Sequence, residues 1–345
     1  MQKQNTDRIV SSKYGRRPPT TIDTKLLLDA AIDRGITVRS LDRTKVYELT
    51  LRDHVEYVNA EWHSGLSAAA FSFTSRKHIT KKFLKRAGVS VSAGKGVMSL
   101  KGATEWAEQH GFPLVMKPVR GIHGSSVHVG VSSMAELGQV YERIKQETGK
   151  NILIEEMFVG TEYRLFATRD RFLAATNRVP ANVVGDVVRT IEQLIEMKNA
   201  DPNRVSKKGG YMRPLFHIEI DAPLKQYLEK HGKTIEDVPA KDEHVQLRGN
   251  SNLSTGGDSI DVTDEVHQSV KDIAVRAVRA IPGLPYAGLD FMTRDVTAPQ
   301  DDKTYIVIEL NASPMLSMHH FPARGQGRDV AGPIIDDLFP EVAKS

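Results

Sequence analysis

Acidic and amide side chains follow an apolar segment near the C-terminus. Residues 305–308 (YIVI) are β-formers and predict a buried strand, and Glu309 and Asn311 follow it. Because residues two apart in an extended chain point to the same side, both side chains should face one point. Their oxygens are hard ligands that suit a magnesium ion held partly by phosphates. A strand that simply ends in a polar loop would carry the same residues.

Asp290 ends the preceding apolar segment, 286–292. If the two segments pair as neighbouring strands, Asp290, Glu309 and Asn311 converge. Three oxygen ligands beside bound phosphates are typical of a metal–nucleotide site. The sequence therefore predicts a site for Mg2+, with Mn2+ as the other candidate, on the last strand pair.

A glycine-bearing loop, 120–126 (RGIHGSS), follows a predicted strand that contains Lys117. Such a loop can bind phosphate oxygens through backbone N–H groups and hydroxyls, and the lysine can add a positive charge. The spacing matches neither a Walker loop nor a Rossmann fingerprint, so a flexible hairpin turn is the alternative. The proposed donors of the loop are Gly121, Gly124, Ser125 and Ser126.

Another predicted strand runs into a turn within 153–162 (LIEEMFVGTE). Its end offers backbone groups to the edge of an adenine ring, and the later carboxylate, Glu162, could accept hydrogen bonds from ribose hydroxyls. A strand with solvated acids would look the same, so this segment has weight only beside the others.

Composition limits the class of protein. The 345 residues are too many for one ordinary core and predict two or three lobes. Cysteine is absent, which excludes disulfides, zinc–thiolate sites and a cysteine nucleophile. We find no apolar run of about 18 residues and no secretory signal pattern at the start, so we expect a cytoplasmic protein without membrane contact.

The formal net charge is +4, with lysines and arginines dispersed along the chain. Only 6% of residues are aromatic, and no aromatic-rich RNA-binding segment is present, so nucleic acid is a poor candidate partner. A polyphosphate ligand fits the same charge with fewer assumptions.

Helices and strands alternate in a mixed α+β or α/β pattern, with 64–73 read as a connection and 318–328 as a glycine-rich loop. The predicted helices are 24–34, 75–87, 104–110, 134–147, 190–198, 224–231 and 264–280. The predicted strands are 36–38, 114–117, 127–131, 151–158, 162–167, 171–176, 244–247, 286–292 and 305–310.

Taken in order, the motifs resemble those of the ATP-grasp ligases. They are VMKP, GIHGSS, LIEEMFVGTEYR, RGNSNLSTGG, GLDF and IELNASP. RVPANVVGD, NADPNR and NLSTGGDSIDVTDEVH resemble cyanophycin synthetases more closely. AAIDRGITVRSLDR, HVEYVN and MHHFPARGQGR resemble the ATP-grasp half of bifunctional glutathione synthetases. The resemblance covers about residues 22–342, without the fused second catalytic module of either protein.

This resemblance implies an ATP-grasp fold, in which two α+β subdomains hold ATP, preceded by a small N-terminal α/β lobe. We expect the lobe at 1–74, the small subdomain with the phosphate loop at 75–158, and the large subdomain with the metal and substrate site at 159–345.

The resemblance also implies a role for each nucleotide-binding residue. Lys77 and Lys117 would contact the phosphates. Glu155 and Glu156 would lie at the adenine edge, and Glu162 would bind the ribose hydroxyls.

Metal and catalytic roles follow in the same way. Asp290, Glu309 and Asn311 would hold two magnesium ions. Arg248 would stabilise the transferring phosphoryl group or an acyl-phosphate, with Asn252 in the same loop.

Substrate residues are less defined by the resemblance. Arg178, Arg324 and Arg328 could each bind a substrate carboxylate as a bidentate donor, or each could form a surface salt bridge. The 120–126 loop and the segments 199–210 and 251–257 are candidate lids.

The function so implied is ATP-dependent joining of an amino acid or short peptide carboxylate to an amine through an acyl-phosphate, with release of ADP and phosphate. Glutathione synthetase-like joining of γ-glutamylcysteine and glycine is one alternative, and an ATP-grasp phosphotransferase is another. A non-catalytic nucleotide-binding regulator would not need all three metal ligands. The sequence is compatible with a homo-oligomer.

Overall fold

The computed structural model describes residues 13–15, 18–41, 45–119, 127–149, 151–206 and 212–342. The chain separates into two compact units, and each unit combines segments that are distant in sequence. We call 66–178 with 260–312 the two-sheet unit, and 1–65 with 179–259 and 313–345 the three-segment unit. The division into 1–74, 75–158 and 159–345 stays a prediction. No helix in the described ranges is long and apolar enough to cross a membrane.

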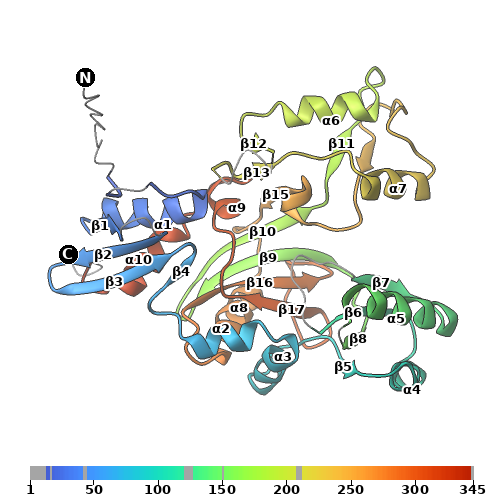
Figure 1. The fold of residues 1–345 in the computed structure, drawn as a ribbon, viewed down its shortest axis with the longest axis horizontal. Coiled ribbons are helices and arrows are strands. Elements are labelled where there is room, and N and C mark those ends of the chain that lie inside the picture. Colours follow the sequence, from blue (N-terminus) through green and yellow to red (C-terminus); the bar gives the residue numbers. More distant parts are fainter. Residues whose placement is uncertain are drawn as a thin grey trace, which may run out of the picture. The chain divides into compact units, whose positions relative to one another are not determined.

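The first sheet of the two-sheet unit is antiparallel, and two helices pack on it (Figure 1). Trp106 and Leu137 of these helices share a core with Met116 and Ile154 of the strands. The strands in sheet order are β5 (Gly94–Val97), β8 (Ile152–Glu156), β6 (Leu114–Pro118) and β7 (His128–Val131). The helices are α4 (Leu100–His110) and α5 (Met134–Thr148).

The second sheet carries the last strand pair. Its strands in order are β15 (Asp258–Asp261), β10 (Phe172–Val179), β9 (Thr161–Thr168), β16 (Tyr286–Thr293) and β17 (Tyr305–Asn311). The predicted pairing of the last two strands is confirmed, and so is the antiparallel pair β9–β10. One face packs on α8 (Gln268–Ala280) in an apolar core (Figure 1), and the opposite face carries the charged residues Arg164 and Asp290.

Helices α2 (Ala68–Thr74) and α3 (Lys77–Arg86) complete the two-sheet unit. The prediction of a mere connection at 64–73 is wrong, because alanines favour a helix there and the Ser67 hydroxyl caps it by accepting from Ala70 N. Helix α8 begins four residues later than predicted, with the His267 side chain accepting from Ser269 N as its N-cap.

The three-segment unit begins with an antiparallel meander. Its strands are β1 (Thr37–Ser40), β2 (Val46–Leu51), β3 (His54–Asn59) and β4 (Trp62–His63). Beside them α1 (Ile22–Asp33) packs on α10 (Ala331–Leu338), where Arg34 contacts Asp336 (Figure 1). The predicted glycine-rich loop at 318–328 begins instead with a helical turn, α9 (Ser317–His320).

The middle segment of this unit forms an apolar cluster of its own, which includes Leu194, Leu224 and Val245. Its strands form two short pairs, β11 (Asn182–Val184) with β14 (His244–Gln246) and β12 (Arg204–Val205) with β13 (Leu215–Phe216). Its helices are α6 (Ile191–Asn199), α7 (Ala222–Lys230) and the 3-10 turn η2 (Leu253–Thr255).

The carboxylate of Asp23 on α1 binds the backbone of the segment that follows β17. Its Oδ1 accepts the N–H groups of Leu316 (3.0 Å) and Ser317 (2.6 Å). Burial raises the pKa of Asp23 to about 6 from its ordinary 3.8, against the lowering effect of these hydrogen bonds. The folded protein therefore binds this proton more tightly than the unfolded chain. The contribution to stability is complete below about pH 4 and is lost as the pH rises through 6.

We predict that the change in free energy of unfolding caused by Asp23→Asn, relative to the parent, is more stabilising at pH 8 than at pH 4. The pKa shift corresponds to about 3 kcal/mol between the two pH values, because the amide does not titrate and any weaker acceptance by it acts equally at both. Thermal unfolding of the variant and the parent at both pH values measures the difference. The exposed Asp33→Asn on the same helix is the control. An equal effect of Asp23→Asn at both pH values would contradict the prediction.

Candidate functional site

The polar residues at the end of β17 lie on the sheet face opposite the apolar core. Val307 is in the core, and so is Leu310, three residues later. Regular alternation cannot bury both, and the register with β16 shifts at this point, so Ile308 forms a β-bulge. The bulge turns Glu309 and Asn311 together to the non-core face. Without it, Glu309 would point into the core beside Val307.

Asp290 of β16 stands directly opposite Glu309 in the antiparallel pair, and Gly288 stands opposite Asn311. Directly opposed residues share a face, with Cβ atoms about 4.5–5.5 Å apart. The two carboxylates and the amide are therefore neighbours on one surface of the sheet, as the sequence predicted for these strands.

Two arginines hold the Asp290 carboxylate. Arg164 Nε lies 2.7 Å from Asp290 Oδ1, and an Arg178 guanidinium nitrogen lies 3.2 Å from Oδ2. Burial alone would raise the pKa of Asp290, but the two positive charges outweigh it and lower the pKa below its ordinary value. Asp290 is therefore a carboxylate although it is buried. Arg178 of β10 also contacts Glu162 of β9. Charged side chains of β9, β10 and β16 are therefore linked on this face.

This donor set fits a hard divalent cation. Asp290 Oδ1 is buried, and its contact with Arg164 Nε at 2.7 Å leaves a second lone pair on that oxygen. A cation would use that lone pair. In the described part of the chain no three acids or histidines are grouped closely enough to bind a metal on their own. The amide of Asn311 and bound phosphates would therefore have to complete the coordination, which is the usual pattern for Mg2+.

Two lysines of α3 contact acidic residues of the two-sheet unit, one at Glu309 and one at Glu155. Lys77, the first residue of the helix, contacts Glu309. One turn later Lys81 contacts Glu155 and donates to Ser92 O at 3.1 Å. No role for Lys81 was predicted from the sequence, although its spacing of four from Lys77 on a helix places both on one side.

Glu155 is buried between two lysines, with Lys117 Nζ 2.6 Å from its Oε2 and Lys81 at its Oε1. Burial alone would raise the pKa of Glu155. The charges of the two lysines outweigh this effect and lower the pKa below its ordinary value. Burial in turn lowers the pKa of Lys81. The group is a compact charged cluster with an excess positive charge on the antiparallel pair β6–β8.

The remaining residues that the sequence predicts to bind the nucleotide are the loop 120–126, Glu156 and Glu162. The loop 120–126 lies outside the described residues, and Gly121, Gly124, Ser125 and Ser126 with it. The strands that flank it, β6 and β7, pair as the predicted hairpin. Glu156 is exposed at the end of β8, and Glu162 is half-buried at the start of β9.

Four predicted residues belong to the three-segment unit. Arg248 is buried and donates to Asp221 Oδ2 at 2.9 Å and to Glu219 O at 3.0 Å. Asn252 caps η2 by accepting from Ser254 N. Arg248 is therefore tied to the segment before α7, and Asn252 to its own loop.

The remaining two lie after α9. Arg324 is exposed, and its backbone N–H donates to Ser259 O at 3.3 Å. Arg328 is half-buried, and its backbone N–H donates to His319 O at 2.8 Å. Of all the predicted residues, the structure thus joins by contact Lys77 with Glu309, Lys117 with Glu155, and Arg178 with Glu162 and Asp290.

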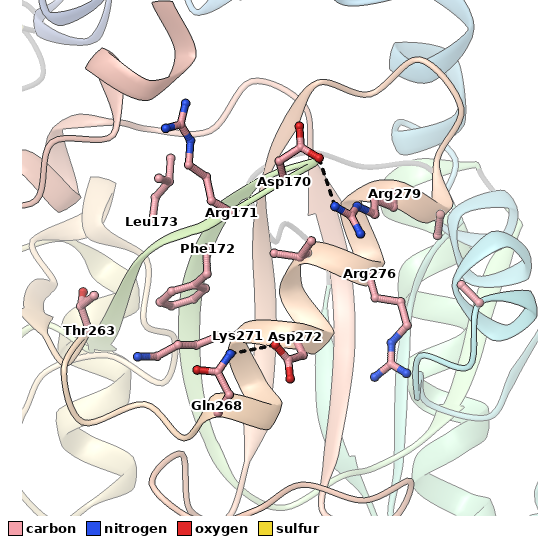
Figure 2. Close-up of a pocket in the computed structure, with 13 residues that line it drawn as sticks. Asp170, Arg171, Phe172, Leu173, Thr263, Gln268, Lys271, Asp272, Arg276 and Arg279 are labelled. Carbon is pink, nitrogen blue, oxygen red and sulfur yellow. Dashed lines mark hydrogen bonds and ion pairs between the residues drawn. The ribbon is translucent and has the colours of Figure 1, made fainter. Parts of the chain in front are cut away.

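A hollow of about 880 Å³ lies elsewhere in the two-sheet unit, between α8 and the turn that joins β9 to β10 (Figure 2). Its acids are already engaged, Asp170 by Arg279 at 3.0 Å and Asp272 by Gln268 at 2.8 Å. Helix α8 covers the core face of the sheet, so this groove is separate from the face that carries Asp290. No predicted site residue lines it.

Known proteins resemble most of the chain. No family model matches it. The chain is 37% identical over 329 residues to the glutathione biosynthesis bifunctional protein GshAB of Pasteurella multocida, covering 93% of this chain and 43% of that protein. It is 32% identical over 326 residues to the cyanophycin synthetase of Crocosphaera subtropica, covering 93% and 37%.

A solved structure agrees with these relatives. The crystal structure of a bifunctional glutathione synthetase from Pasteurella multocida matches with a TM-score of 0.72 and 37% identity, over 92% of this chain and 43% of that one. The chain thus spans less than half the length of the relatives it matches.

Proposed function

Because the chain has the ATP-grasp fold and is homologous to the ATP-grasp part of bifunctional glutathione synthetases and cyanophycin synthetases, we propose that it is an ATP-dependent, ADP-forming ligase that joins a carboxylate to an amine. The observation that carries the proposal is the grouping of Asp290, Glu309 and Asn311 on one sheet face, with Lys77 at Glu309.

The reaction follows from the poor electrophilicity of a carboxylate. A carboxylate oxygen of the first substrate attacks the γ-phosphorus of ATP, the bond to the bridging oxygen breaks, and ADP leaves. The amine of the second substrate then attacks the activated carbonyl carbon and loses a proton. Phosphate leaves with the oxygen that came from the carboxylate, and an amide remains. No protein nucleophile is needed, which agrees with a chain that has no cysteine.

Charge neutralisation is the main contribution of the protein, as in other phosphoryl transfers. We assign the phosphates to Lys77 and Lys117, the adenine edge to Glu155 and Glu156, and the ribose hydroxyls to Glu162. The proposed 120–126 loop would add its four donors. Magnesium, when bound by Asp290, Glu309 and Asn311, would supply positive charge beside the transferring phosphoryl group.

Arginines are assigned to the reacting groups. Arg178 lies on the same sheet face as Asp290, which supports contact with the reacting carboxylate. We assign the acyl-phosphate to Arg248, with Asn252 in its loop, and a distal substrate carboxylate to Arg324 and Arg328. The segments 199–210 and 251–257 stay candidate lids, because an acyl-phosphate must be kept from water.

The substrates are amino acids or short peptides. The identity to GshAB favours one specific second candidate within this class, the joining of γ-glutamylcysteine and glycine. Since the reaction consumes ATP, we propose the cytoplasm as its compartment. A homo-oligomer is compatible with the proposal.

One assay tests the proposal. Purified protein with Mg2+ and ATP is given pooled amino acids and γ-glutamyl dipeptides, and phosphate release and product masses are followed. We expect phosphate release that needs both a carboxylate and an amine substrate, and a product of mass equal to the two substrates minus water. A stable phosphorylated product without free phosphate would instead identify a phosphotransferase.

A further inference from the structure

We propose that Arg164, to which the motifs and the comparisons assign no role, is a positioning residue that fixes the Asp290 carboxylate for cation binding. This inference rests on the proposed ligase function, because it concerns the cation that accompanies ATP.

Strand geometry places the two residues together. Arg164 of β9 is directly opposite Asp290 of β16 in the antiparallel ladder. Its neighbours Tyr163 and Leu165 are in the core, so Arg164 points to the face that carries Glu309 and Asn311. Asp290 therefore has Glu309 on one side and Arg164 on the other, at the same level of the sheet.

Burial restricts both side chains, so the contact between Arg164 and Asp290 persists in the folded protein. Arg164 is 6% exposed and Asp290 is 7% exposed, so neither side chain can turn out into water. Replacing a buried ion pair by apolar residues is often neutral or stabilising, so stability alone is a weak reason for an arginine here. The position of the cation site gives a stronger one.

The contact also leaves the carboxylate available. Arg164 Nε is 2.7 Å from Asp290 Oδ1, and a carboxylate oxygen has two lone pairs, so this contact leaves one of them. The guanidinium therefore orients the carboxylate by charge while the lone pair of Oδ1 is still open to a cation. Arg178, on Oδ2, is shared with Glu162 and cannot replace Arg164 without leaving that partner.

A positioning role has a defined consequence. Loss of an outer partner of a metal ligand typically reduces metal affinity 10–100-fold. Because Arg164 acts through Asp290, a cation at high concentration should overcome the loss. A residue that contacted the transferring phosphoryl group would instead lower kcat at any cation concentration.

Binding of Mn2+ in the presence of ADP, followed by electron paramagnetic resonance, tests the inference without turnover. We expect Arg164→Met to weaken Mn2+ binding about 10–100-fold and Arg164→Lys, which keeps the charge, to weaken it less than about 10-fold. Initial rates should show a higher Mg2+ requirement for Arg164→Met and a kcat near that of the parent at saturating Mg2+. Arg171→Met, in the groove of Figure 2, is the matched control and should bind Mn2+ normally.

The outcomes separate the two proposals. Normal Mn2+ binding and a normal Mg2+ requirement in Arg164→Met would overturn the positioning role alone. Failure of the parent protein to bind Mn2+ with ADP would overturn the proposed function as well. If Arg164→Met does not fold, Arg164→Gln, which also removes the charge but keeps a polar side chain, decides: an unchanged Mn2+ affinity and Mg2+ requirement would overturn the role, and a weakened affinity with kcat restored by Mg2+ would support it.

Discussion

Replacing Glu309 by glutamine is expected to lower kcat about 10²–10³-fold while the protein still folds. Glutamine keeps the size of the side chain but removes the negative charge opposite Asp290, on the sheet face that we propose binds the metal. Loss of one preorganised electrostatic group costs about this factor in other enzymes. The Glu309 side chain is 32% exposed, so its charge contributes little to stability. Phosphate release at saturating ATP and substrate measures the rate, and circular dichroism with thermal unfolding checks the fold.

Two companion variants sharpen this result. Asn311→Ala removes the amide on the same face and should also lose most of the activity. Glu265→Gln, at an exposed turn of the same unit, should behave as the parent. Near-normal rates in both Glu309→Gln and Asn311→Ala would remove these residues from the metal site.

Replacing Glu155 by glutamine is expected to destabilise the protein by about 3–5 kcal/mol, the usual cost of removing one partner of a buried ion pair. The change would leave Lys81 and Lys117 buried together without their shared carboxylate. Burial already lowers the pKa of Lys81, so its ammonium form depends on that partner. Urea unfolding of the variant and the parent gives the difference in free energy of unfolding.

An exposed pair supplies the control for Glu155. Lys101 Nζ is 3.9 Å from Glu105, and both side chains are solvent-exposed, so Glu105→Gln should change the free energy of unfolding by less than about 0.5 kcal/mol. Adding Lys81→Met to Glu155→Gln should recover part of the lost stability, because it removes one of the unpaired charges. Equal effects of Glu155→Gln and Glu105→Gln would show that the buried cluster is not what holds this region.

Local patterns predicted much of the secondary structure and the neighbouring placement of Asp290, Glu309 and Asn311. Runs of apolar β-formers identified β16 and β17, and the polar residues near their ends were expected to converge if the strands paired, as they do. The helix at 68–74 was missed because small residues suit both helices and loops, and the Ser67 cap decides between them only in context.

Other features depend on contacts between distant segments. The bulge at Ile308 is set by the register with β16, which no single segment encodes, yet it determines which face Glu309 occupies. Arg164 and Lys81 read as ordinary charges in sequence, and their roles appear only beside Asp290 and Glu155. The two units are likewise built from separated segments, which are defined by contacts between residues distant in sequence.

Oxygen transfer from the carboxylate substrate tests the central claim most directly. The carboxylate identified in the pooled assay is labelled with ¹⁸O and turned over with ATP and the amine. If the acyl-phosphate forms, one labelled oxygen leaves with the phosphate, and mass spectrometry should detect phosphate that carries one ¹⁸O for each amide formed. Phosphate without label, at an unchanged rate of product formation, would contradict the account.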